Sequence, residues 1–112
     1  MDGGELDRLD ELFSPDVVYD LEDFGFGSLQ GSDAIRDAAL QLGARNPLAH
    51  HVTNVVIAGD DERGVRVLSK GLAVNADGSA GSVVYDDLVR REDSGWRIAY
   101  RKVSARRVPL QA

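Results

Sequence analysis

The chain has 112 residues, of which 43% are hydrophobic and 29% are charged, with a net charge of −6 at pH 7. This composition is typical of a soluble globular protein, so we expect a single domain over residues 1–112. The acidic balance argues against nucleic acid as a partner, no apolar run approaches the ~20 residues of a membrane-spanning helix, and the lack of cysteine excludes disulfides. Because the N-terminus has no signal-peptide pattern, the expected location is the cytoplasm.

The first half of the chain predicts two helices and a short strand. Leucine and phenylalanine recur at helical spacing in residues 4–13, which indicates an amphipathic helix. Residues 14–16 end this helix, because a residue that precedes proline avoids the helical region. Residues 17–21 are typical of a short strand, and a second helix is predicted over residues 32–43, ending at a glycine.

The second half predicts four long strands, over residues 48–58, 64–76, 80–92 and 95–107. Asp77-Gly78 is a strong hairpin signal between the second and third of them. In the second strand, Val65 and Val67 occupy odd positions whereas Leu68 and Leu72 occupy even ones, which predicts a bulge near Val67-Leu68. Long antiparallel strands twist and curl. The expected fold class is therefore α+β, with a curved antiparallel sheet wrapped around N-terminal helices.

The only two histidines, His50 and His51, lie side by side at the start of an apolar run. A strand points alternate side chains to opposite faces, so one histidine faces the core or a pocket and the other faces away. An imidazole titrates near neutral pH, and one facing inward is a candidate for proton transfer; the alternative is a hydrogen-bonded core histidine. Because the two point in opposite directions they cannot chelate one ion, and we expect no metal site.

Four aromatic side chains are further candidates. Phe24 and Phe26 flank glycines in a loop, where they could gate the mouth of a pocket. Tyr19 and Trp96 are expected to pack in the core. The glycines around Phe26 do not complete a dinucleotide-binding fingerprint, so no cofactor is expected.

Polar residues of the third long strand allow two interpretations. Tyr85 and Asp87 share a strand face, where they would anchor a ligand oxygen. The alternative is that Asp86, Asp87, Arg90 and Arg91 form cross-strand ion pairs, each worth about 0–1 kcal/mol. For Asp86 and Arg91 the ion-pair interpretation is favoured.

Five segments carry a resemblance to a known family: residues 9–20, 31–35, 50–54 (His-His-Val-Thr-Asn), 85–90 and 95–101. In this order and spacing, the chain resembles the SnoaL-like branch of the nuclear transport factor 2-like, or cystatin-like, superfamily. The resemblance implies a cone-shaped sheet with a pocket at its wide end. Relatives include ketosteroid isomerase, scytalone dehydratase, limonene epoxide hydrolase, bile-acid dehydratase and polyketide cyclases, along with members that only bind or assemble.

The resemblance also implies catalytic residues. In dehydratase-like members a histidine and an aspartate form an acid/base dyad, and His50 and Asp2 match these positions. Since Met1 directly precedes Asp2, we expect the first helix to be shortened. A carboxylate fixes the imidazole tautomer and raises its basicity, and the imidazole takes a proton next to a carbonyl and returns it to a leaving hydroxyl.

The expected function is that of a cofactor-independent lyase or isomerase acting on a small apolar carbonyl compound. The alternative is a non-catalytic ligand-binding or dimerisation module on the same fold. The residues expected around the substrate are Tyr19, Phe24, Phe26, Val52, Asn54, Tyr85 and Asp87, with His51 facing away. Apolar residues on both sheet faces predict a homodimer through the outer face, including residues 80–92 and 95–107.

Overall fold

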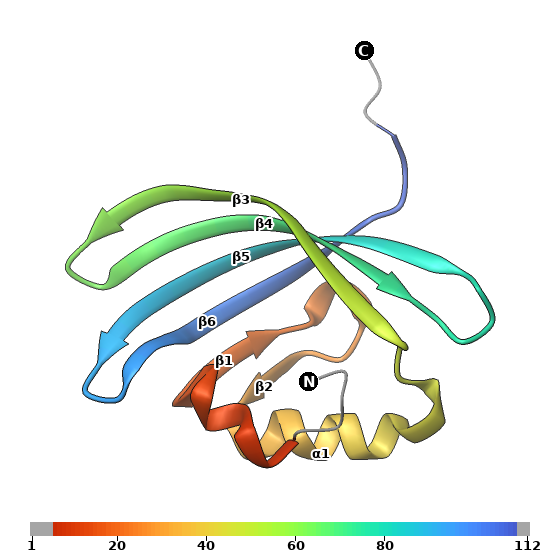
Figure 1. The fold of residues 1–112 in the computed structure, drawn as a ribbon, viewed down its shortest axis with the longest axis horizontal. Coiled ribbons are helices and arrows are strands. Elements are labelled where there is room, and N and C mark those ends of the chain that lie inside the picture. Colours follow the sequence, from red (N-terminus) through yellow and green to blue (C-terminus); the bar gives the residue numbers. More distant parts are fainter. Residues whose placement is uncertain (1–5, 110–112) are drawn as a thin grey trace.

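A strongly curved sheet of six strands arches over one α-helix (Figure 1). The computed structural model describes residues 6–109. The strands are β1 (Phe13–Asp20), β2 (Ser28–Gln30), β3 (Ala49–Asp61), β4 (Gly64–Val74), β5 (Ala80–Glu92) and β6 (Gly95–Arg106). The helix is α1 (Ser32–Leu42), and three short 3-10 helices are η1 (Leu6–Glu11), η2 (Glu22–Phe24) and η3 (Gly43–Arg45). The predicted α+β class with a curved sheet is confirmed.

The strand order β2-β1-β6-β5-β4-β3 combines two kinds of pairing. The four long strands β3 to β6 follow one another in antiparallel hairpins, as predicted. β1 joins the far side of β6 in parallel, and the short β2 pairs with β1 in antiparallel fashion. The two strands of the N-terminal third thus form one edge of the sheet, next to β6. Helix α1 packs beneath β1 and β2.

The helix predicted over residues 4–13 is wrong in its described part. The chain forms the 3-10 helix η1 with non-helical angles at Arg8, and strand β1 already begins at Phe13. The backbone N–H of Ile98 donates a hydrogen bond to the carbonyl of Leu12 at 2.9 Å, so pairing with β6 draws this segment into the sheet. Pro15 is tolerated there because the β1–β6 register is interrupted between Phe13 and Val18.

The bulge predicted near Val67-Leu68 is also misplaced. β4 pairs with β5 without interruption, and the register shifts instead lie in β3, where Asn54 adopts a positive φ of 55°, and between β5 and β6. The change of phase in β4 has another cause. Leu68 and Leu72 lie on the convex face and Val65 and Val67 on the concave face, so both faces of a regular strand are apolar.

The buried core lies where α1 and η1 meet β1 and β6. It consists of Leu9, Phe13, Val17, Ile35 and Ile98, with Tyr19, Leu29 and Val89 packed against it. Trp96, which was predicted to be a core residue, is 54% exposed. It pairs with Arg91 at the end of the β5–β6 hairpin. Burying an aromatic ring needs a covering layer, and none of the described elements provides one there.

Candidate functional site

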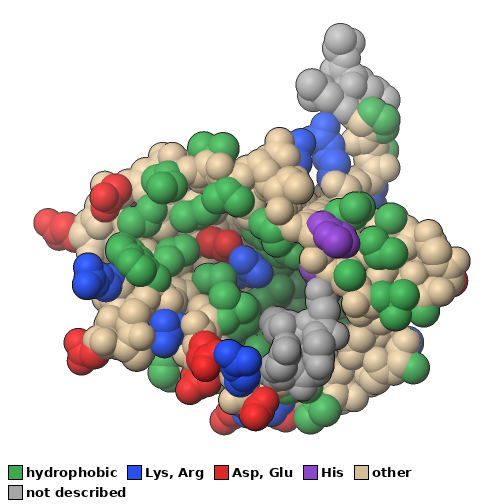
Figure 2. All heavy atoms as spheres, viewed as in Figure 1, with side chains coloured by type: hydrophobic (Ala, Val, Ile, Leu, Met, Phe, Trp, Pro, Cys, Tyr) green, Lys and Arg blue, Asp and Glu red, His purple; other side chains and the backbone are tan. Residues whose placement is uncertain are grey.

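A cavity of about 310 Å³ lies between the concave face of the sheet and α1. The space-filling view shows hydrophobic side chains gathered around a hollow in this region (Figure 2). Most of the sixteen lining residues are apolar, and the polar ones among them are Tyr19, Asn46, His50 and Tyr85. An apolar cavity with a few convergent polar groups is typical of a small-molecule site, and this one lies at the lower end of the size range of such sites.

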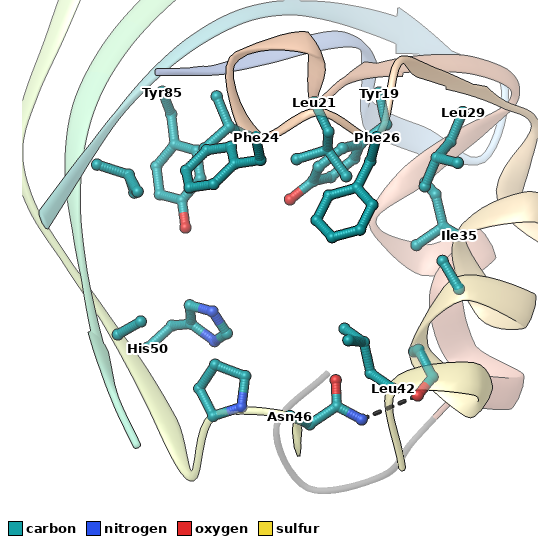
Figure 3. A pocket seen from close by; sticks show the side chains of 16 residues that line it. Tyr19, Leu21, Phe24, Phe26, Leu29, Ile35, Leu42, Asn46, His50 and Tyr85 are labelled. Carbon is teal, nitrogen blue, oxygen red and sulfur yellow. Dashed lines mark hydrogen bonds between the residues drawn. The ribbon is translucent and has the colours of Figure 1, made fainter. Parts of the chain in front are cut away.

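Strand β3 carries His50 into the cavity. His50 pairs with Ala73 of β4, which also lines the cavity, and the imidazole points into the open space in the close-up view (Figure 3). His51 pairs with Leu72 on the convex face and does not line the cavity. The regular stretch of β3 before Asn54 places the two imidazoles on opposite faces of the sheet.

The end of α1 is fixed beside His50 by a side chain that the sequence analysis did not select. The Asn46 side-chain amide donates hydrogen bonds to the carbonyls of Ala39 and Gly43, at 2.8 and 2.9 Å. Both carbonyls also accept a backbone N–H, from Gly43 and from Asn46 respectively, so the amide adds a second donor to each at the end of the helix. Leu48 then donates its backbone N–H to Val74 and starts β3. An asparagine between a terminal glycine and a proline was the available signal.

Two tyrosines present hydroxyls to the same cavity. Tyr85, on β5, is 5% exposed, and Tyr19, on β1, packs edge-on against Phe13 with ring centroids 5.8 Å apart. In Figure 3 both phenol oxygens point into the space that His50 enters from another wall. Burial raises the pKa of Tyr19 above its ordinary value of 10.0, and the positive charge of Arg101 offsets part of that rise.

Asp87 lies behind Tyr85 rather than on the cavity wall. Its carboxylate accepts two hydrogen bonds from Arg101, at 2.8 and 2.9 Å, so the ion-pair interpretation describes its contacts. The Arg101 guanidinium in turn lies 4.2 Å from the centre of the Tyr85 ring. Arg101 was not among the predicted site residues. Its signal was the register of the β5–β6 hairpin, which sets Arg101 opposite Asp87.

The loop between β1 and β2 supplies Phe24 and Phe26 to the cavity wall. Phe26 is 66% exposed, so this wall borders the opening. The loop is attached to the end of β6, because the Asp23 carboxylate accepts a hydrogen bond of 2.6 Å from the backbone N–H of Ala105. The guanidinium of Arg107 lies 5.7 Å from the centre of the Phe24 ring.

Two further expected site residues are not on the cavity wall. Val52 shares the concave face with His50 but is 53% exposed, and Asn54 sits in the β3 bulge, also exposed. Neither lines the cavity. Asp2, the expected partner of His50, lies outside the described residues. The structure therefore unites Tyr19, Phe24, Phe26, His50 and Tyr85 around one space, with Asp87 behind them.

In the part of the chain that the structure describes, no group of three histidine, cysteine, aspartate or glutamate side chains is placed as metal ligands would be. No helix within residues 6–109 has the length and apolar character needed to cross a membrane.

Comparison with known proteins identifies the family. A family model described as a SnoaL-like domain matches residues 1–102. This chain belongs to the SnoaL-like family. A comparison with curated protein sequences gave no match.

Solved structures share the fold of this SnoaL-like chain. A candidate aromatic ring hydroxylase from Novosphingobium aromaticivorans is 26% identical, with a TM-score of 0.77 over 98% of this chain and 80% of that one. A candidate scytalone dehydratase from the same organism is 23% identical, with a TM-score of 0.73 over 99% and 79%. A Nostoc punctiforme protein with a cystatin-like fold is 18% identical, with a TM-score of 0.75 over 94% and 79%. The cystatin-like fold implied by the sequence is confirmed.

Proposed function

We propose that this SnoaL-like protein is a cofactor-independent lyase or isomerase that binds a small apolar carbonyl compound in the cavity and uses His50 as its acid/base. The observation that carries the proposal is an imidazole directed into an apolar cavity. Histidine is the side chain whose unperturbed pKa suits proton transfer near neutral pH. The candidate scytalone dehydratase of similar fold supports the same class of reaction by analogy.

The proposed reaction consists of two proton transfers. An imidazole nitrogen of His50 takes a proton from the carbon next to the carbonyl, and the electron pair of that C–H bond moves to the carbonyl oxygen as an enolate. The imidazolium then returns the proton. In a substrate with a neighbouring C=C bond, delivery to the far carbon of that bond moves the double bond and completes an isomerisation. In a substrate with a hydroxyl on the next carbon, delivery to that hydroxyl releases water, and the electron pair of the enolate forms a new C=C bond and completes a dehydration.

Deuterium exchange tests the proposal without knowledge of the natural substrate. The probe is β-tetralone, a two-ring ketone with exchangeable protons beside its carbonyl. The protein is expected to accelerate exchange in deuterated water, and His50→Ala is expected to abolish the acceleration. His51→Ala is the matched control, because the neighbouring histidine lies on the other face of the sheet. Equal activity of His50→Ala and the parent protein would contradict the role of His50.

The second candidate function is ligand binding without catalysis. The apolar lining of the cavity favours it, because burial of apolar surface alone can hold a small molecule. Tight binding of β-tetralone without acceleration of exchange would select this function over the enzymatic one.

A further inference from the structure

Two aspartates that are neighbours in β5 form the same ion pair in opposite environments. Asp86 binds Arg66 on the convex face, where the side chains are 38% and 57% exposed. Asp87 binds Arg101 on the concave face, where the side chains are 5% and 16% exposed. Removing two charges from water costs several kcal/mol per ion, which an ion pair repays only with good geometry and additional hydrogen bonds. The Asp87–Arg101 pair therefore depends on the groups that surround it inside the protein.

The guanidinium of Arg101 interacts with three side chains. It donates two hydrogen bonds to Asp87, it lies 4.2 Å from the centre of the Tyr85 ring, and its positive charge lowers the pKa of the Tyr19 phenol. Arginine has five N–H donors and no acceptor. The Tyr19 hydroxyl therefore cannot donate to this cation, and its hydrogen is directed to a different acceptor.

The same cation acts on Tyr85 through its ring. A guanidinium over an aromatic face is attracted to the electron density of the ring. It stabilises negative charge that develops on the phenol oxygen as the hydroxyl donates a hydrogen bond, which makes that hydroxyl a stronger donor. Both phenol oxygens point into the cavity (Figure 3).

We infer that Arg101, fixed by Asp87, is a positioning residue that sets the hydroxyls of Tyr19 and Tyr85 as hydrogen-bond donors to an oxygen acceptor of the bound ligand. The ligand class that follows is a one- or two-ring apolar molecule with a carbonyl oxygen. A cavity of about 310 Å³ has room for a molecule of this size. The inference rests on the proposed function in that it describes a ligand of the same cavity, but it does not require His50 to move a proton.

The test compares β-tetralone with tetralin, the hydrocarbon that lacks the carbonyl, by calorimetric or fluorescence titration. The parent protein is expected to bind the ketone about tenfold more tightly than the hydrocarbon, which corresponds to one good hydrogen bond. Arg101→Met/Asp87→Leu removes both charges together, so no buried charge is left alone. This variant is expected to lose the preference for the ketone and to keep its affinity for tetralin. Arg66→Met/Asp86→Leu, the same change on the convex face, is expected to keep the preference.

Two further measurements test the inference, and the first of them does not require the double variant to fold. Tyr19→Phe and Tyr85→Phe delete the hydroxyls while leaving the ion pair in place. Each is expected to weaken binding of the ketone more than binding of the hydrocarbon. The Tyr19 phenol, followed by its ultraviolet absorbance as the difference from Tyr19→Phe, is expected to titrate at higher pH once Arg101 is replaced, because Arg101 lowers the pKa of Tyr19 more than Asp87 raises it.

Three results would overturn the inference: equal affinity of the parent protein for the two probes, no binding of either probe, or an unchanged preference in Arg101→Met/Asp87→Leu. The proposed function is judged separately. A ketone preference that depends on Arg101, without accelerated deuterium exchange, supports the inference and contradicts the enzymatic role of His50. Accelerated exchange together with a ketone preference that does not depend on Arg101 supports the enzymatic role of His50 and contradicts the inference about Arg101.

Discussion

Gly71 of β4 lies directly against the phenol ring of Tyr85 on β5. A Cβ atom placed at Gly71 would lie 2.9 Å from the Tyr85 Cζ and 2.8 Å from the Val83 Cγ2, closer than real Cβ contacts allow. The Tyr85 ring therefore occupies the space that any other residue at this position would fill. The absence of one side chain in β4 sets the position of a cavity-lining ring in β5.

Gly71→Ala is accordingly expected to displace the Tyr85 ring from its place over Arg101. Overpacking of this kind costs about 1–3 kcal/mol of unfolding free energy. Denaturant unfolding measures that loss, and β-tetralone affinity is expected to fall with it. Gly81→Ala is the control, since a Cβ there meets no atom within 4 Å and its effect should stay within about 0.5 kcal/mol. Wild-type affinity in Gly71→Ala would show that ligand binding does not depend on the Tyr85 position.

Alkaline pH is expected to destabilise the protein through Tyr19. Burial raises the pKa of Tyr19 in the folded state above the value of 10.0 for an exposed phenol. The folded protein then holds this proton more tightly than the unfolded chain. The corresponding stability is fully present below pH 10.0 and is lost as the pH rises through the higher pKa of the folded state. Urea unfolding across this range measures the loss, and Tyr19→Phe should reduce its slope; an identical slope would assign the effect to other groups.

Release of the β1–β2 loop is expected to loosen the cavity mouth. Asp23→Ala removes the carboxylate that accepts from Ala105 and pairs with Arg107. Hydrogen exchange at the Ala105 amide should accelerate, and β-tetralone should dissociate faster because Phe24 lies on this loop. The control is Asp33→Ala, which breaks an exposed pair with Arg36 in the first turn of α1. Unchanged dissociation in Asp23→Ala would indicate that the loop does not gate the cavity.

The convex face of the sheet is the proposed dimer interface. Val56, Leu72 and Tyr100 are exposed apolar residues on this face, which soluble monomers generally avoid when such residues are contiguous. Light scattering is expected to give twice the chain mass of 12.1 kDa at micromolar concentration. Leu72→Asp should shift the mass to that of one chain. Leu40→Asp, which changes an exposed residue of α1, should not shift it. A parent mass of a single chain would contradict the interface.

The parts of the structure that the sequence predicted depend on local patterns. The hairpin at Asp77-Gly78 follows from turn chemistry, and Gly78 has the expected positive φ of 86°. The opposite directions of His50 and His51 follow from alternation in a regular stretch of strand. The family resemblance, carried by five short segments, predicted the cystatin-like fold that isolated elements could not specify.

The parts that it did not predict depend on distant residues. Asn54 adopts a left-handed conformation that its sequence neighbours do not signal, so the phase of β3 after that point, and with it the place of the later residues, could not be derived. The extent of η1 depends on pairing with β6, more than eighty residues away. Arg101 becomes part of the site only through the β5–β6 register that sets it opposite Asp87.

The position of the bound ketone tests the role of His50 more directly than any activity measurement. Nuclear Overhauser effects between β-tetralone and the protein report contacts between individual protons. We predict effects from the protons beside the carbonyl to the imidazole C–H protons of His50, and from the ketone to the ring protons of Tyr85. Effects to His51, or none to His50 at saturating ketone, would contradict the proposal that His50 acts on a carbonyl compound in this cavity.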